Sequence, residues 1–177
     1  MGKISPSGRV KIVVGLIFND TGVFDKTASS LSRRLGPIDH QSETFKFDYT
    51  DYYKGEMGAG LKRKFISFRK LRGLDRVWEL KIASNKIEEK FSDSGCRKIN
   101  IDPGYLTMSK LVLLTTKNYA HRMHLKDGIY SEITLFYKNG SYRPWEWTYP
   151  DYASREYISF FNSTRESYSN QVGVKEL

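Results

Sequence analysis

The stretch that decides the fold is Val10-Lys11-Ile12-Val13-Val14-Gly15-Leu16-Ile17-Phe18. Every residue in it except Lys11 and Gly15 is apolar, and most of the apolar ones are β-branched. Near-continuous runs of this kind are typical of strands that are buried on both faces of a sheet. We therefore expect a central strand here and place the other elements around it.

Two amphipathic helices are expected in the first half of the chain. The first ends at the stop signal Gly36-Pro37, and the second follows Asp75, which is a suitable N-cap. The residues at helical spacing are Phe24, Thr27, Leu31 and Leu35 in the first, and Leu80, Ala83, Ile87 and Phe91 in the second.

Three further strands complete this half. Residues 44–49 alternate between apolar and polar, residues 64–68 form a second candidate, and Ile99 and Ile101 mark a third that Asp102-Pro103-Gly104 ends. The resulting order, β-α-β-β-α-β, is that of a ferredoxin-like unit.

The second half has a different pattern. Residues 108–116 are expected to form a short helix. Asp127-Gly128 and Asn139-Gly140 are two-residue hairpin signals, so they predict a three-stranded antiparallel meander over about residues 120–147. A last helix would present Tyr157, Phe161, Thr164 and Tyr168 on one stripe. The expected fold class is α+β: a ferredoxin-like βαββαβ half, the meander and a C-terminal helix.

The composition favours a single domain over the 177 residues, with loose arms at 1–9 and about 170–177. Cys96 is the only cysteine, so no internal disulfide can form. The longest apolar run, residues 12–18, is shorter than the about 20 residues that span a membrane. The N-terminus lacks the apolar core of a signal peptide. We expect a cytoplasmic protein without a membrane partner.

The net charge of +9 is concentrated in residues 61–76, which contain seven Lys/Arg and one Asp. Such a basic stripe attracts phosphate on nucleic acids, nucleotides or anionic metabolites. The alternative is a solvated face. A Gly-rich run that leads into basic residues, residues 55–64, could cradle an anion with its backbone N–H groups or be a plain flexible loop.

Acids, histidines and aromatic residues gather in four short segments, more densely than a fold requires. These are residues 47–53, 100–105, 121–124 and 145–152. We interpret them as parts of a binding or catalytic surface.

The hairpin signals predict which residues of the meander share a face. If both loops have two residues, His121 lies opposite Thr134, which lies opposite Trp145, and Met123 lies opposite Glu132. The shared face then carries His121, Met123, Leu125, Tyr130, Glu132, Thr134, Phe136, Arg143, Trp145 and Trp147. Flat aromatics mixed with His, Glu and Arg suit a ligand with a ring and a charge. The alternative is a core with a satisfied Glu–His pair, and a one-residue bulge would change both faces.

Asp48 and Asp51 lie near the end of one predicted strand and Asp102 at the end of another. If the three converge, they could hold a divalent cation through oxygen ligands or act as general acid and base. The alternative is turn chemistry, because Asp side chains bond backbone groups in turns.

Five phrases of the chain form a recognisable set: Phe47-Asp48-Tyr49-Thr50-Asp51-Tyr52-Tyr53, Asn100-Ile101-Asp102-Pro103-Gly104-Tyr105-Leu106, His121-Arg122, Gly128-Ile129-Tyr130 and Trp147-Thr148-Tyr149-Pro150-Asp151-Tyr152. In content and order they resemble a bacterial family catalogued as domain of unknown function 4416. The resemblance covers nearly the whole chain. It implies a cytosolic bacterial protein with no established activity and no assigned catalytic residues. Members are sometimes labelled GTP-binding proteins, although this chain contains no known GTPase motif.

We therefore expect a pocket for a phosphorylated or otherwise anionic small molecule, such as a nucleotide, with or without acid–base chemistry. The catalytic candidates are His121, Glu132, Asp102 and Asp48. The ligand-binding candidates are Tyr49, Asp51, Tyr52, Glu56, Lys62, Arg63, Tyr105, Arg122, Tyr130, Arg143, Trp145, Trp147, Tyr149 and Asp151. In this interpretation, replacing Trp147 or Glu132 with Ala weakens binding and changes stability little.

Two alternatives belong to other functional classes. An RNA-binding module would use the basic stripe and exposed aromatic residues, and its affinity would fall steeply with added salt. A protein-interaction scaffold would use the aromatic face without a concave pocket.

Overall fold

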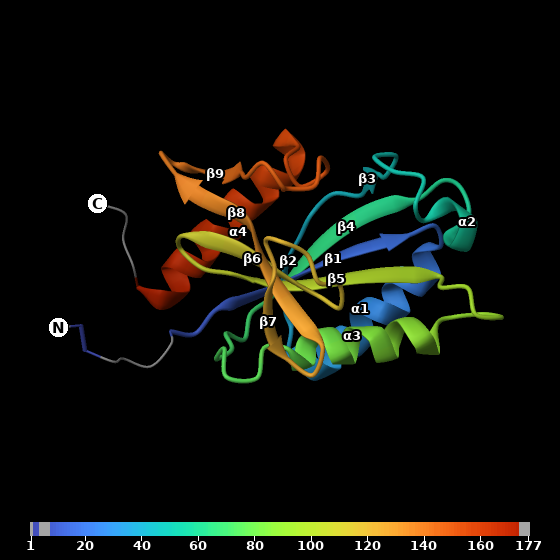
Figure 1. Ribbon diagram of the computed structural model, residues 1–177, viewed down its shortest axis with the longest axis horizontal. Helices are drawn as coiled ribbons and strands as arrows, with labels where there is room; N and C mark the ends of the chain where they lie inside the picture. Colours follow the sequence, from blue (N-terminus) through green and yellow to red (C-terminus); the bar gives the residue numbers. More distant parts are fainter. Residues whose placement is uncertain (1, 4–7, 174–177) are drawn as a thin grey trace.

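The predicted central strand is β1 (Lys11–Phe18), and all eight of its residues are buried. It lies inside a nine-stranded sheet of order β2-β4-β1-β5-β6-β8-β7, in which β3 also pairs with β4 and β9 with β8 (Figure 1). Every pairing is antiparallel. The other strands are β2 (Ile38–Gln41), β3 (Phe45–Lys46), β4 (Lys62–Phe68), β5 (Ile99–Leu106), β6 (Lys110–Thr115), β7 (Met123–Lys126), β8 (Ile129–Lys138) and β9 (Ser141–Pro144).

This computed structural model describes residues 2–3 and 8–173. The rest of the expected arms, residues 1, 4–7 and 174–177, lies outside the described residues. Residues 170–172, also assigned to an arm, belong to the last helix. No described helix has the length and apolarity needed to cross a membrane.

Helices cover both faces of the sheet. The helices are α1 (Thr21–Leu35), α2 (Lys54–Met57), α3 (Glu79–Lys90) and α4 (Arg155–Val172). α1 and α3 pack on the face that carries Ile12, Val14 and Leu16, whereas α4 packs on the face that carries Val13 and Phe65 (Figure 1). The predicted buried stripes of α1 and α4 are confirmed. The mixed α+β class and the C-terminal helix are therefore confirmed.

The prediction of a helix over residues 108–116 is wrong, because this segment contains strand β6. A short apolar run fits a strand or a helix equally well by periodicity, and pairing with β5 and β8 decides for the strand. The helix expected after Asp75 begins only at Glu79. Residues 44–49 contain only the two-residue strand β3, and the main edge strand is β2.

Both hairpins are confirmed, since Lys126 pairs with Ile129 and Lys138 with Ser141. The predicted three-stranded meander is not confirmed. β6 pairs with one edge of β8, so β7 and β9 both pair with the other edge, at its two ends. A bulge between His124 and Lys126 also shifts the register of β7. Met123 therefore pairs with Ser131 and not with Glu132.

Candidate functional site

The sheet opens between β5 and β6. β5 pairs with β1 along its whole length, but with β6 only from Gly104 to Leu106. Asp102-Pro103-Gly104, predicted to end this strand, lies inside it. The backbone groups of Ile101 bond to α3, so they face away from β1, and Pro103, two residues on, faces the same way. Because Pro103 has no N–H to donate, the ladder to β6 stops beside it.

Helix α3 closes the unpaired edge of β5 with two buried charged side chains. Lys81 Nζ donates to the carbonyl of Ile101 at 2.8 Å, and the N–H of Ile101 donates to Glu88 Oε1 at 2.5 Å. These bonds satisfy backbone groups that β6 leaves unpaired, and they explain why α3 buries Lys81 and Glu88.

A pocket of about 610 Å³ lies at this opening. Its walls come from the loop at residues 47–53, from β4, α3 and β5, and from residues 92, 97, 113–117, 122, 132 and 149–152. The volume is in the range of small-molecule sites. Residues of the segments 47–53, 100–105 and 145–152 thus line one cavity together with Arg122 and Glu132.

The floor of the pocket is built around Arg63, whose side chain is only 3% exposed. Its Nη1 donates to Asp102 Oδ2 at 2.7 Å and its Nη2 to Asp151 Oδ2 at 3.0 Å. The guanidinium also lies over the rings of Phe47 and Tyr152. Arg63, which the sequence placed in a basic stripe, is therefore an internal ion-pair centre.

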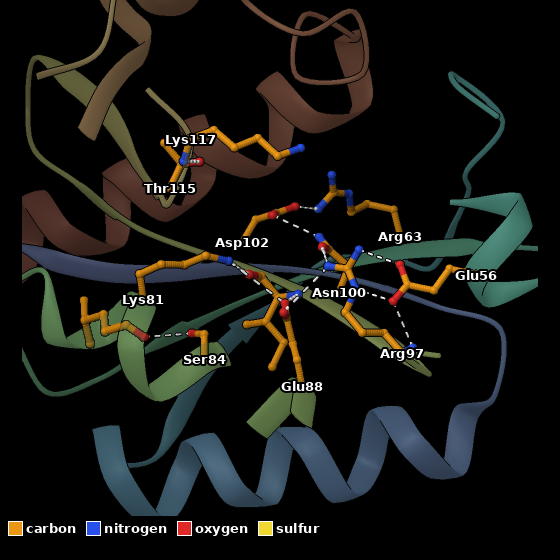
Figure 2. Close-up of polar contacts among 12 residues, drawn as sticks. Glu56, Arg63, Lys81, Ser84, Glu88, Arg97, Asn100, Asp102, Thr115 and Lys117 are labelled. Carbon is orange, nitrogen blue, oxygen red and sulfur yellow. Dashed lines mark hydrogen bonds and ion pairs between the residues drawn. The ribbon is translucent and has the colours of Figure 1, made fainter. Parts of the chain in front are cut away.

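One wall continues this network. Asn100 Nδ2 donates to Asp102 Oδ1 at 2.9 Å, and Arg97 Nη1 donates to Asn100 Oδ1 at 3.0 Å. Arg97 in turn holds the carboxylate of Glu56 with Nε at 2.8 Å and Nη2 at 2.7 Å. Figure 2 shows these contacts as a continuous chain from Arg63 to Glu56.

The pocket lining contains a second ion pair. Arg122 Nε donates to Glu132 Oε2 at 2.7 Å, and its Nη2 donates to the hydroxyl of Tyr149 at 2.9 Å. Glu132, at 2% side-chain exposure, also contacts His121 Nε2 at 3.2 Å. Glu132 and Arg122 line the pocket, while His121 does not.

Trp145 and Trp147 lie outside the pocket and stack with one another. The Trp147 ring is nearly parallel to those of His121 and Trp145, with centroids 5.4 and 5.2 Å away. Trp147 Nε1 also donates to the carbonyl of Ile133, in the gap that β7 and β9 leave on β8. The ring faces of Trp147 are thus already in contact with protein.

The structure brings part of the predicted set together. Eight candidates line the pocket: Glu132, Asp102, Tyr49, Tyr52, Arg63, Arg122, Tyr149 and Asp151. The others do not line it: His121, Asp48, Asp51, Glu56, Lys62, Tyr105, Tyr130, Arg143, Trp145 and Trp147.

The three acids considered for a metal do not converge. Asp48 and Asp51 are exposed and pair with Lys46 and Lys54, whereas Asp102 lies in the pocket. Among residues 2–3 and 8–173 there is no group of three or more His, Cys, Asp or Glu side chains placed to hold a metal ion.

Burial and neighbouring charges shift the pKa values of the floor carboxylates in opposite directions. Burial favours the protonated form of Asp102, but Arg63 and Lys81 hold its pKa below the ordinary value. Burial raises the pKa of Asp151, and Arg63 offsets this only in part. Burial likewise raises the pKa of Glu88. Two carboxylates on one guanidinium thus differ in acidity.

Sequence reasoning did not identify four pocket residues, namely Lys81, Glu88, Arg97 and Lys117. A usable signal was present only in α3, where Lys81 and Glu88 are seven residues apart and hence on one helix face. Lys117 follows β6 and reaches the pocket from the side opposite Arg97 (Figure 2). Its Nζ donates to the hydroxyl of Tyr52 at 3.2 Å.

One family model, described as "Domain of unknown function (DUF4416)", matches residues 8–168. No curated protein and no solved structure matches the chain.

Proposed function

This chain belongs to the DUF4416 family, whose description names no activity, and we propose its function from the pocket itself. We propose that the pocket binds a small molecule that carries a phosphate or another anionic group, such as a nucleotide.

One observation carries the proposal: a cation without a carboxylate partner stands at the mouth of a pocket with a buried ionic floor. Among the described residues, the Lys117 ammonium contacts only the hydroxyl and ring of Tyr52. Every other cation of the pocket is paired with a carboxylate. An anionic ligand group would supply the missing partner of Lys117.

Two further features support a small-molecule site over a purely structural network. Buried ion pairs such as Arg63–Asp102 contribute little net stability, because the desolvation of the ions offsets their attraction. Ionisable groups with shifted pKa values also cluster at functional sites. The exposed rings of Tyr49, Tyr52 and Tyr149 at the pocket offer surfaces on which a base or sugar could stack.

The first experiment is native mass spectrometry of the freshly purified protein, followed by denaturing release and titration with AMP. We expect a mass excess that resolves to a phosphate-bearing molecule, or measurable AMP binding. Lys117→Met should weaken either signal at least about tenfold, the scale of one charge-assisted hydrogen bond. Lys86→Met is the matched control, because Lys86 is exposed and lies outside the pocket. An apo mass together with no AMP binding would contradict the proposal.

The RNA alternative has less geometric support. The basic stripe of residues 61–76 does not form one surface, because Arg63 is buried on one face of the sheet while Lys64 lies over Phe24 on the other. A steep loss of RNA affinity with added salt would still favour it over the small-molecule site.

We also infer that the first half is a ferredoxin-like unit within a single cytoplasmic domain. The order β2-β4-β1-β5, with antiparallel neighbours and with α1 and α3 in the crossovers, supports the unit. The continuity of one sheet through both halves supports the single domain.

A further inference from the structure

The ion pairs around the pocket contain one more carboxylate than cation. The cations number four, namely Arg63, Lys81, Arg97 and Arg122. The carboxylates number five, namely Glu56, Glu88, Asp102, Glu132 and Asp151. The formal charges of these nine residues therefore leave an excess of one negative charge.

The excess lies on the floor. Arg63 is shared between Asp102 and Asp151, so this trio alone has two negative charges for one positive charge. The Asp102 side chain is 26% exposed and Asp151 only 7%, so Asp102 is the one that a ligand can reach. Each oxygen of Asp102 accepts one hydrogen bond and has a lone pair to spare.

The opposite charge is in excess at the mouth, where Lys117 has no carboxylate partner among the described residues. The cavity thus presents a negative group at depth and a positive group at its rim (Figure 2). A ligand complementary to this arrangement has a cation at one end and an anion at the other.

We infer that the pocket takes a dipolar ligand, with a protonated amino group on Asp102 and a phosphate or carboxylate on Lys117. This inference rests on the proposed function, to which it adds the amino group. The Arg63 and Asn100 contacts fix the Asp102 carboxylate in place, so the amino group would meet a preorganised acceptor.

The test is calorimetric titration with phosphates that differ in one substituent: glucosamine 6-phosphate, glucose 6-phosphate and N-acetylglucosamine 6-phosphate. We expect glucosamine 6-phosphate to bind at least about tenfold more tightly than the other two, as one charge-assisted hydrogen bond predicts. Asp102→Asn should abolish this preference, whereas Lys86→Met, outside the pocket, should leave it unchanged. Lys117→Met should weaken all three.

The outcomes separate the two claims. Equal binding of all three sugars to the wild-type protein overturns the amino-group inference and leaves the anion site standing. No binding of any of them, together with no AMP binding and an apo mass after purification, overturns both. If Asp102→Asn fails to fold, the comparison of the amine with its N-acetyl form on the wild-type protein still decides the inference.

Discussion

Arg63 on β4 and Asp102 on β5 form an ion pair that crosses β1, with 2.7 Å between Nη1 and Oδ2. The guanidinium passes over Gly15, which pairs with Asp102 in the sheet. A Cβ at Gly15 would lie 2.8 Å from Arg63 Nη1, so the missing side chain makes room for the crossing. A glycine inside a strand often marks such a close approach.

Removing the guanidinium should strongly destabilise the protein. Arg63→Met leaves Asp102 and Asp151 without their shared cation, and breaking a buried pair costs about 3–5 kcal/mol. Urea unfolding measures this loss. Lys62→Met on the same strand is the control, because Lys62 is exposed and should change stability by less than about 0.5 kcal/mol. Equal effects of the two changes would contradict the buried-network interpretation.

Filling the space above β1 should also destabilise the protein, but less than the loss of the Arg63 guanidinium does. Gly15→Ala places a methyl group 2.8 Å from Arg63 and 2.9 Å from Phe65 Cε1, so we expect a loss of about 1–3 kcal/mol from overpacking. Gly55→Ala meets no atom within 4 Å and should be neutral or slightly stabilising. Thermal unfolding compares the two, and an unchanged Tm for Gly15→Ala would show that Arg63 lies elsewhere.

The shifted pKa of Asp102 predicts a specific dependence of stability on pH. Its folded value lies below the ordinary 3.8, so its contribution is fully present above that pH and is lost as the pH falls through the folded value. The stability difference between wild type and Asp102→Asn should therefore shrink below about pH 4. Urea titrations from pH 7 to pH 3 measure it, and a difference that stays constant would exclude the shift.

Asp151 should behave in the opposite way. Its folded pKa lies above the ordinary 3.8, so protonation favours the folded state, and its ionisation destabilises that state as the pH rises through the shifted value. Asp151→Asn should therefore lose less stability than Asp102→Asn at pH 7. Side-by-side urea unfolding of the two variants tests this order, and the reverse order would contradict it.

Glu132 should behave as a structural residue, contrary to the expectation from sequence. Glu132→Ala leaves Arg122 buried without its counter-ion, so we expect a loss of about 3–5 kcal/mol. Glu146→Ala is the control, since Glu146 is exposed. If Glu132→Ala left the unfolding midpoint near that of the control, the sequence-based interpretation as a surface ligand contact would be restored.

Local signals were sufficient for the elements that depend on neighbours in the chain. Both hairpins form where Asp127-Gly128 and Asn139-Gly140 predict them, and all four residues have positive φ, as type I′ turns require. The stripe of α4 is buried as its helical spacing predicts. These features were readable because each is set by residues only a few positions apart.

The sequence predicted the candidate site only in part. The dense polar segments marked Asp102, Arg122 and Asp151 as candidates, and the predicted face of the meander marked Glu132. All four line the pocket. The pairing assumed between β7 and Glu132 failed, because β6 takes one edge of β8 and β7 carries a bulge. No local pattern specifies which strand occupies which edge.

By itself the sequence determined the buried strand β1, the amphipathic helices α1 and α4 and the turns, because these follow from periodicity and backbone preference. Only the tertiary structure decided that Asp102-Pro103-Gly104 lies within a strand, that the sheet opens there, and that Arg63 reaches Asp102 across β1. The physical reason is that the effect of a proline's missing N–H or a glycine's missing side chain depends on which strand lies beside it. The local sequence does not specify that neighbouring strand.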